Sequence, residues 1–160
     1  MPLPPFQSAL DEHADAVARF LAASVGRDEA EDCLQETLLA ALRAYPRLRP
    51  GSNVRAWLLT IARNKALDSH RARARRPVPV GAPSDDRADS PLELASEGDG
   101  VDDDVWGAVR ELAPKQRAAV VLRFVNDLSH REIAAVLECS EAASRRSLHE
   151  GLTKLREELT

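Results

Sequence analysis

Residues 77–104 restrict the fold of this chain more than any other segment, because little in them could pack into a hydrophobic core. They contain four prolines and three glycines, and nine acidic residues against one basic residue give them a net charge of −8. Such a segment repels itself and gains too little from burial to offset the entropy of ordering it. We therefore predict a flexible acidic linker at 77–104. It separates two domains, residues 1–76 and 105–160, each large enough for three or four helices.

The composition of the flanking segments favours helices over strands. Only six of the 160 residues are aromatic, whereas sandwiches and barrels depend on aromatic and β-branched side chains. Apolar residues recur instead at helical spacing. We predict an all-α protein of two small helical domains, an N-terminal helical bundle and a C-terminal helix-turn-helix bundle, with helices over 10–25, 29–45, 54–76, 105–112, 114–125, 130–137 and 141–159.

Residues with capping side chains mark four of these helix starts. Asp28 and Asn53 are predicted to cap the second and third helices. Ser129, with Glu132 three residues later, predicts a capping box, and Ser140 predicts a cap on the final helix. Two short helices joined by a tight turn indicate a helix-turn-helix, although a plain helical hairpin in a bundle gives the same pattern.

Basic residues gather immediately before the linker. Residues 49–76 contain eight basic residues and one acidic residue, a net charge of +7. The third predicted helix would bury Val54, Trp57, Leu58 and Ile61 and continue as a basic arm. A row of cations of this kind neutralises phosphates and gives salt-dependent affinity for nucleic acid. Two solvated faces of opposite charge would explain the charges alone equally well.

The sequence contains little that supports catalysis. It has no phosphate-binding loop, no nucleophile turn and no zinc-binding helix motif. Cys33 and Cys139 lie far apart and are expected to be structural. Carboxylates within residues 28–36 could ligate a divalent cation in a small nuclease, but solvated groups at a helix N-terminus explain them more simply. We predict a non-enzymatic protein with no metal and no other cofactor.

The distribution of apolar residues argues against a membrane or secreted protein. No apolar run approaches the roughly 20 residues that span a bilayer. The N-terminal residues lack the pattern of a signal peptide, and two distant cysteines fit a reducing compartment. We expect a cytoplasmic protein without membrane insertion.

Four segments resemble a known family, in the order in which that family has them. Residues 28–45 (DEAEDCLQETLLAALRAY) and 53–76 (NVRAWLLTIARNKALDSHRARARR) resemble region 2 of the extracytoplasmic-function sigma factors of bacterial RNA polymerase. Residues 111–123 (ELAPKQRAAVVLR) and 127–137 (DLSHREIAAVL) resemble their region 4, and the acidic stretch falls where the family has its linker. The resemblance implies a promoter-specificity subunit that recruits polymerase and melts DNA without catalysis of its own, and that is nucleoid-associated when bound to polymerase.

The resemblance also implies a docking surface for core RNA polymerase on the second helix. Carboxylates and an amide there match the surface that the family uses for the β′ clamp helices, and they suit a basic coiled coil through charge-assisted hydrogen bonds. The resemblance implies the β subunit as a second polymerase contact, and it allows an anti-sigma factor as a further partner. The matching residues are Glu31, Asp32, Gln35 and Glu36.

Two contacts with promoter DNA follow from the same resemblance. At the −10 element a flipped base and the opened strand would be held by Leu48, Arg49, Gly51, Ser52, Asn53, Arg55, Arg63, Asn64, Arg71, Arg75 and Arg76. At the −35 element the major groove would be contacted by Ser140, Arg145, Arg146, Ser147 and His149.

Three residues depart from the family pattern in the second domain. Glu138 stands in the turn where glycine is usual, so a left-handed backbone there would be mildly strained. Ser144 replaces a usual valine, and Glu150 replaces a common basic residue and would repel phosphate. The −35 preference is therefore open, and the end of the chain at Thr160 leaves no room for an extra C-terminal domain. Two alternatives also stay open: a free-standing helix-turn-helix regulator and a small metal-dependent nuclease.

Overall fold

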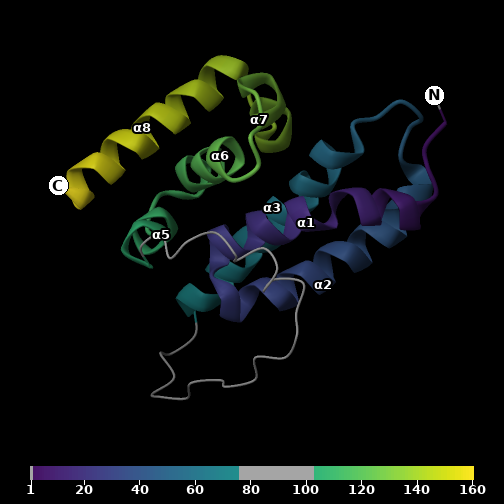
Figure 1. Cartoon of the computed structure of the whole chain (residues 1–160), viewed down its shortest axis with the longest axis horizontal. Coiled ribbons are helices and arrows are strands. Elements are labelled where there is room, and N and C mark those ends of the chain that lie inside the picture. Colours follow the sequence, from purple (N-terminus) through teal and green to yellow (C-terminus); the bar gives the residue numbers. More distant parts are fainter. Residues whose placement is uncertain (1, 76–102) are drawn as a thin grey trace.

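The computed structural model describes residues 2–75 and 103–160, which form two helical domains (Figure 1). The N-terminal domain contains α1 (Phe6–Val25), α2 (Arg27–Ala44), the short 3-10 helix η1 (Tyr45–Arg47) and α3 (Val54–Arg75). The C-terminal domain contains α5 (Asp103–Arg110), α6 (Pro114–Phe124), α7 (His130–Leu137) and α8 (Glu141–Leu159). Every regular element within these ranges is a helix, and the all-α prediction is confirmed.

Most of the predicted linker, and Arg76 before it, lie outside the described residues. The last two linker positions, 103 and 104, belong instead to the first turn of α5. A helix start accommodates acidic residues because the helix N-terminus carries a partial positive charge.

In the N-terminal domain each of the three long helices packs against the other two. Phe20 and Leu21 of α1 and Leu58 and Leu59 of α3 are almost fully buried. The expected cap of α2 is wrong. Gly26 holds a φ of +82° and occupies the capping position, its N–H donating to the Ala22 carbonyl (3.1 Å), so α2 starts at Arg27 and Asp28 lies inside its first turn.

The capping predictions in the helix-turn-helix are confirmed. The Ser129 hydroxyl accepts from the Glu132 N–H at 3.2 Å while the Glu132 carboxylate accepts from the Ser129 N–H at 3.4 Å. Ser140 caps α8 by accepting from the Ala143 N–H at 3.0 Å. Glu138 adopts the left-handed conformation with φ +54°, as the sequence led us to expect.

A close approach of α8 to α6 depends on Gly151. A methyl group at this position would lie 3.0 Å from Cγ2 of Val120, which is closer than van der Waals packing allows. The glycine therefore sets the spacing of two core helices, although a glycine inside a helix costs stability relative to alanine.

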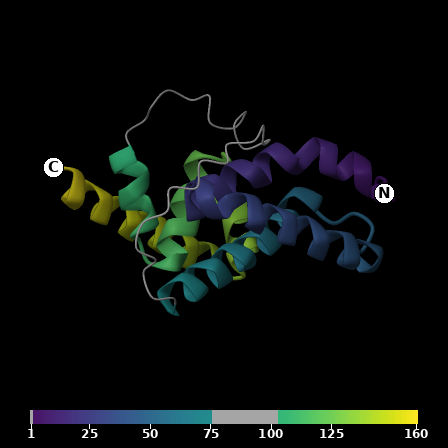
Figure 2. The same cartoon turned by 90° about the horizontal axis from the view of Figure 1, so that it is seen from below.

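The two domains pack against each other. Helices α5 and α6 lie on α1, and α7 lies on α3, as both views show (Figures 1 and 2). The buried residues of both domains form one continuous hydrophobic cluster. The C-terminal domain thus covers one side of α3.

This packing corrects the predicted core face of α3. Of the four residues expected to be buried, Leu58 is fully buried, while Val54, Trp57 and Ile61 are only partly buried. The fully buried positions are Ala56, Leu58, Leu59, Ala62 and Ala66. The helix buries two faces, because the N-terminal domain packs on one side and the C-terminal domain on another.

Candidate functional site

The outer face of α2 presents the acidic and amide side chains that the sequence singled out. Glu31, Asp32, Gln35 and Glu36 are all exposed, whereas Leu34 and other positions between them turn into the core. Helical periodicity produces this separation, since residues three and four apart share a face. Two large apolar side chains, Leu39 and Leu42, are each 53% exposed farther along the helix.

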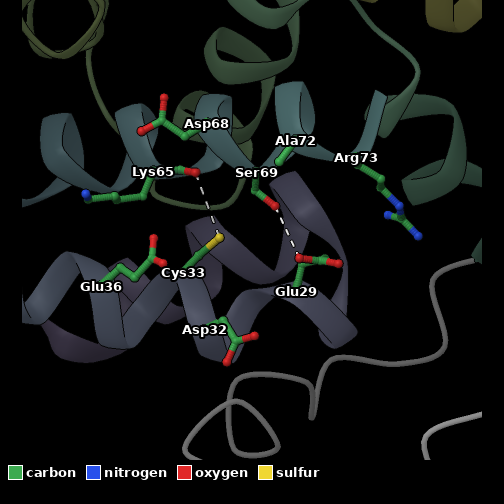
Figure 3. A pocket seen from close by; sticks show the side chains of 9 residues that line it. All are labelled: Glu29, Asp32, Cys33, Glu36, Lys65, Asp68, Ser69, Ala72 and Arg73. Carbon is green, nitrogen blue, oxygen red and sulfur yellow. Dashed lines mark hydrogen bonds between the residues drawn. The ribbon is translucent and has the colours of Figure 1, made fainter. Parts of the chain in front are cut away.

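A groove of about 300 Å³ lies between α2 and α3 (Figure 3). Asp32 and Glu36 line it from α2, and Lys65 and Asp68 line it from α3. The Ser69 hydroxyl donates to Glu29 Oε2 across it at 3.3 Å. The groove therefore has an acidic side on α2 and a side of mixed charge on α3, where Lys65 and Arg73 accompany Asp68.

Cys33 lies at the floor of this groove and is buried, as expected for a structural cysteine. Burial raises the pKa of its thiol, and the carboxylates of Glu36, Glu29 and Asp32 raise it further. The thiol is thus kept protonated, which makes it a poor nucleophile and a poor metal ligand. Within residues 2–75 and 103–160, no cluster of three His, Cys, Asp or Glu side chains is arranged to hold a metal ion.

The loop before α3 is ordered by its own polar side chains. The Ser52 hydroxyl donates to the Arg49 carbonyl at 2.7 Å, and Gly51 adopts φ +83°. Oδ1 of Asn53 accepts from the Ala56 N–H at 3.1 Å, which confirms the predicted cap. This cap leaves the amide nitrogen of Asn53 to donate elsewhere. Leu48 and Ser52 are half-buried, and Arg49, Gly51 and Asn53 are exposed.

The structure separates this loop from Asn64. Asn64 lies eleven positions after Asn53, about 16 Å along the helix axis at the usual rise. The two therefore do not form one pocket, and each is a separate candidate contact. Asn64 is exposed, as are Arg71 and Arg75 near the end of α3.

Arg55 and Arg63 lie on a different face of α3 and are half-buried. The Arg55 guanidinium donates to the main-chain carbonyl of Asn126, in the loop between α6 and α7. Arg63 lines a small interdomain crevice together with Pro114 and Arg117. The residues proposed for the −10 element therefore divide into an exposed group and a group that faces the C-terminal domain.

The sequence did not predict which residues of the C-terminal domain contact this face of α3. The side-chain amide of Asn126, itself buried, donates to the Ala16 carbonyl of α1 at 2.9 Å. Arg117 is buried and donates to the carbonyls of Arg110 and Leu112, both at 3.1 Å. An asparagine in a polar loop gives no sequence signal for a long-range contact, because local hydrogen bonding explains it equally well.

His70 lies near the end of α3, with Nε2 2.8 Å from the Ser24 carbonyl. Burial lowers the pKa of this imidazole, and the positive charge of Arg117 lowers it further. The effect of Arg117 crosses the interface between the domains.

The candidate −35 residues lie on the outer side of α8. Arg145, Arg146, His149 and Ser140 are exposed, and Ser147 is half-buried. Nη2 of Arg145 pairs with Oε1 of Glu141 at 2.9 Å. Both partners of this pair are exposed, so it contributes little stability and is readily exchanged for another acceptor.

Two of the departures from the family pattern acquire a structural explanation. Ser144 is almost fully buried between α7 and α8, and its hydroxyl donates to the Glu141 carbonyl at 3.0 Å and contacts the His130 carbonyl at 3.3 Å. It anchors α8 through polar contacts where an apolar residue would pack. Glu150 is exposed and accepts from Gln116 at 3.4 Å.

Comparisons with known proteins agree with this arrangement. The family model for sigma-70 region 2 matches residues 9–76, and the model for sigma-70 region 4 matches residues 102–155. The chain is 36% identical over 154 residues to the RNA polymerase sigma factor CarQ of Myxococcus xanthus, which covers 95% of this chain and 87% of CarQ. It is 31% identical over 162 residues to the ECF RNA polymerase sigma factor SigX of Bacillus subtilis, which covers 96% of this chain and 83% of SigX.

The fold is also similar to that of a solved sigma factor. The sigma factor RpoE of Bartonella quintana, determined in complex with the anti-sigma factor NepR, matches with a TM-score of 0.71 at 25% identity and covers 96% of both chains. Among the described helices, none has the length and apolar character needed to cross a membrane. The matches to both sigma-factor regions exclude the free-standing regulator, and the nuclease is excluded because the sigma-factor family is not enzymatic. The chain belongs to the extracytoplasmic-function sigma factors of the sigma-70 family, which direct RNA polymerase to promoters and start transcription.

Proposed function

We propose that this protein recognises promoters through three separate surfaces, each of which binds a different partner. The acidic face of α2, formed by Glu31, Asp32, Gln35 and Glu36, binds core polymerase. The loop 48–53 and α3 hold the opened −10 element, and α8 contacts the −35 duplex. The observation that carries this division is that one acidic face and two arginine-bearing faces lie on three different helices.

The chemistry of each surface fits its proposed partner. Exposed carboxylates on α2 suit basic side chains of the β′ clamp helices, and the exposed Leu39 and Leu42 supply apolar area beside them. Asn and Ser in the loop offer donors and acceptors for the edge of a flipped base. On α8, Arg145 and Arg146 can form bidentate hydrogen bonds to guanine in the major groove.

We further propose that the protein acts in the cytoplasm, where polymerase and promoter DNA are found, and that a protein of the anti-sigma class binds it. The support for the second point is that a solved relative is held by such a protein.

The polymerase surface is tested by reversing one charge on it. Asp32→Arg should weaken binding to core polymerase at least about tenfold, because it places a cation against a basic partner. The double variant Gln35→Ala with Glu36→Ala should weaken it less. Both are measured in competition with another sigma factor, and Glu157→Arg on the exposed end of α8 is the matched control. Unchanged affinity of Asp32→Arg, with an unchanged helical spectrum, would remove α2 from the docking surface.

A further inference from the structure

The small crevice between the domains lies where α1, α3 and α6 meet. Its free space is about 10 Å³, which is room for one ion or molecule of about the size of water. Apolar side chains form most of its wall, and its polar lining consists of Ser24 of α1, Arg63 of α3 and Arg117 of α6. The described residues that line it therefore include two cations and no carboxylate.

The hydroxyl of Ser24 is buried at this crevice and has no hydrogen-bond partner among the described residues. The residue as a whole is only 2% exposed. Hydroxyls inside helices commonly donate to the carbonyl four residues earlier. In this chain Thr37, Thr60 and Thr153 do so, at 2.6, 2.8 and 2.9 Å. Ser24 makes no such bond, so its hydroxyl is free to donate to a ligand in the crevice.

Two arginines bring positive charge to the same crevice. Arg117 is 7% exposed, and its hydrogen bonds within the described part of the chain all come from Nη1, to the carbonyls of Arg110 and Leu112. Neither Arg117 nor Arg63 forms an ion pair with a carboxylate there. Burial lowers the pKa of Arg117, and the carboxylate of Glu111 opposes this effect without pairing with it. A buried cation without a counter-ion is costly, because burial removes the water that solvates it.

The N-terminus of α6 adds a partial positive charge beside these arginines. The helix begins at Pro114, which lines the crevice, and Ala113 before it supplies no side-chain cap. The N–H groups of the first turn therefore lack a capping acceptor. An uncapped helix N-terminus attracts anions through these groups and through the helix dipole.

The same positive charge acts on His70, which contacts Ser24 through the main chain, with Nε2 2.8 Å from the carbonyl oxygen. After burial, the guanidinium of Arg117 is the next cause of the lowered pKa of this imidazole. Arg73 on the same helix lowers the pKa further, and Glu29 of α2 has a smaller opposite effect. The charge around the end of α1 is therefore positive on balance.

From these observations we propose that the crevice binds a single halide ion, held between the hydroxyl of Ser24 and the guanidinium groups of Arg63 and Arg117. The free space suits a monatomic anion and is too small for a carboxylate or a phosphate group. The ion gives the Ser24 hydroxyl an acceptor and the two arginines a counter-ion, and it joins α1, α3 and α6. This site does not depend on the proposed contacts with promoter DNA.

Thermal unfolding of the full chain tests the site in sodium chloride, sodium bromide and sodium gluconate at equal ionic strength. Gluconate is too large for the crevice. Chloride and bromide should therefore raise Tm by about 2–4 °C above its value in gluconate, once the halide concentration is several times its dissociation constant. Equal Tm values in all three salts would overturn the proposal and leave the crevice to water.

Replacing Ser24 distinguishes a halide site from an unpaired hydroxyl without a ligand. Ser24→Ala should not lower Tm in gluconate, because no hydrogen bond is lost there, but it should remove most of the increase that halide gives. Ser69→Ala, which removes a hydroxyl that donates to Glu29 in the other groove, is the matched control and should keep the increase. If Ser24→Ala also keeps it, the ion does not lie in this crevice.

The cations of the site are tested in the same way. Arg63→Gln should lose most of the halide-dependent increase in Tm, because one of the two guanidinium groups that hold the ion is gone. Arg19→Gln removes the same charge from an exposed position of α1 outside the crevice, and it should keep the increase. An equal loss in both variants would show a general effect of net charge and would contradict the site.

The pKa of His70 supplies a readout that a general effect of salt on stability does not give. A bound anion partly cancels the charge of Arg117, so the pKa of His70 should rise when chloride replaces gluconate at equal ionic strength. Titration of the imidazole signals by NMR measures this shift. In Ser24→Ala the rise should be absent. A pKa of His70 that is the same in both salts in the parent protein would overturn the proposal.

Discussion

The two helices proposed to contact promoter DNA, α3 and α8, differ in how exposed their candidate contact residues are. The candidate contacts on α8 are exposed or half-buried on its outer side, and the Arg145–Glu141 ion pair among them is a weak surface pair. On α3, part of the candidate set is exposed and part faces the second domain. The proposed contacts of α8 are therefore open to solvent in this structure, whereas Arg55 and Arg63 of α3 are partly covered by the C-terminal domain.

The largest expected effect concerns the core that supports α8. Ile133 of α7 is fully buried, so Ile133→Ala should lower the free energy of unfolding by about 2–5 kcal/mol. Urea unfolding followed by circular dichroism measures this. Because α7 also packs on α3, the variant should loosen the contact between the domains as well. A loss below about 1 kcal/mol would contradict the placement of Ile133 in a tightly packed core.

The next prediction concerns the arginines on the exposed face of α8. Arg145→Ala or Arg146→Ala should cost about 1–3 kcal/mol of discrimination if the arginine contacts guanine, whereas loss of a phosphate contact weakens all sequences alike. Duplexes selected from a random library distinguish the two cases. Arg156→Ala, exposed near the end of the same helix, is the control. If both substitutions leave affinity and selection unchanged, α8 does not contact the duplex through these residues.

The smallest effect concerns the turn that positions α8. Glu138 has φ +54°, so Glu138→Gly should stabilise the protein by roughly 0.5–1 kcal/mol because glycine adopts this conformation without strain. Ala135→Gly, at an exposed helical position of α7, should instead destabilise it by about 1 kcal/mol. Thermal unfolding of the pair checks the opposite signs. Equal destabilisation by both would show that the turn is not strained.

The helix-turn-helix could be predicted from the sequence because its determinants are local. Ser129, Glu132 and Ser140 form the caps that their spacing indicates, and Glu138 takes the left-handed conformation that its place in the turn requires. The acidic face of α2 was predictable for the same reason, since helical periodicity alone separates Asp32 from the buried Leu34.

The environment of α3 could not be predicted in this way. Its second buried face exists because the C-terminal domain, which follows the acidic segment, packs on it. The spacing of Leu59, Ala66 and Arg55 in the sequence does not distinguish contact with the other domain from contact within the same bundle. The start of α2 was predicted wrongly because Asp28 has a side chain typical of a helix cap. In the structure Gly26 instead caps both the end of α1 and the start of α2.

The central claim is that α3 and the loop before it open the −10 element, and permanganate reactivity of its thymines in the complex with polymerase tests it most directly. Asn64→Ala and substitutions in the loop 51–53, made separately, should each lower this reactivity and change which −10 base is preferred. Polymerase docking and −35 binding should persist, since those contacts lie on α2 and α8. If Asn64→Ala and the loop variants all open every promoter variant as well as the parent does, α3 and its loop are not the −10 surface.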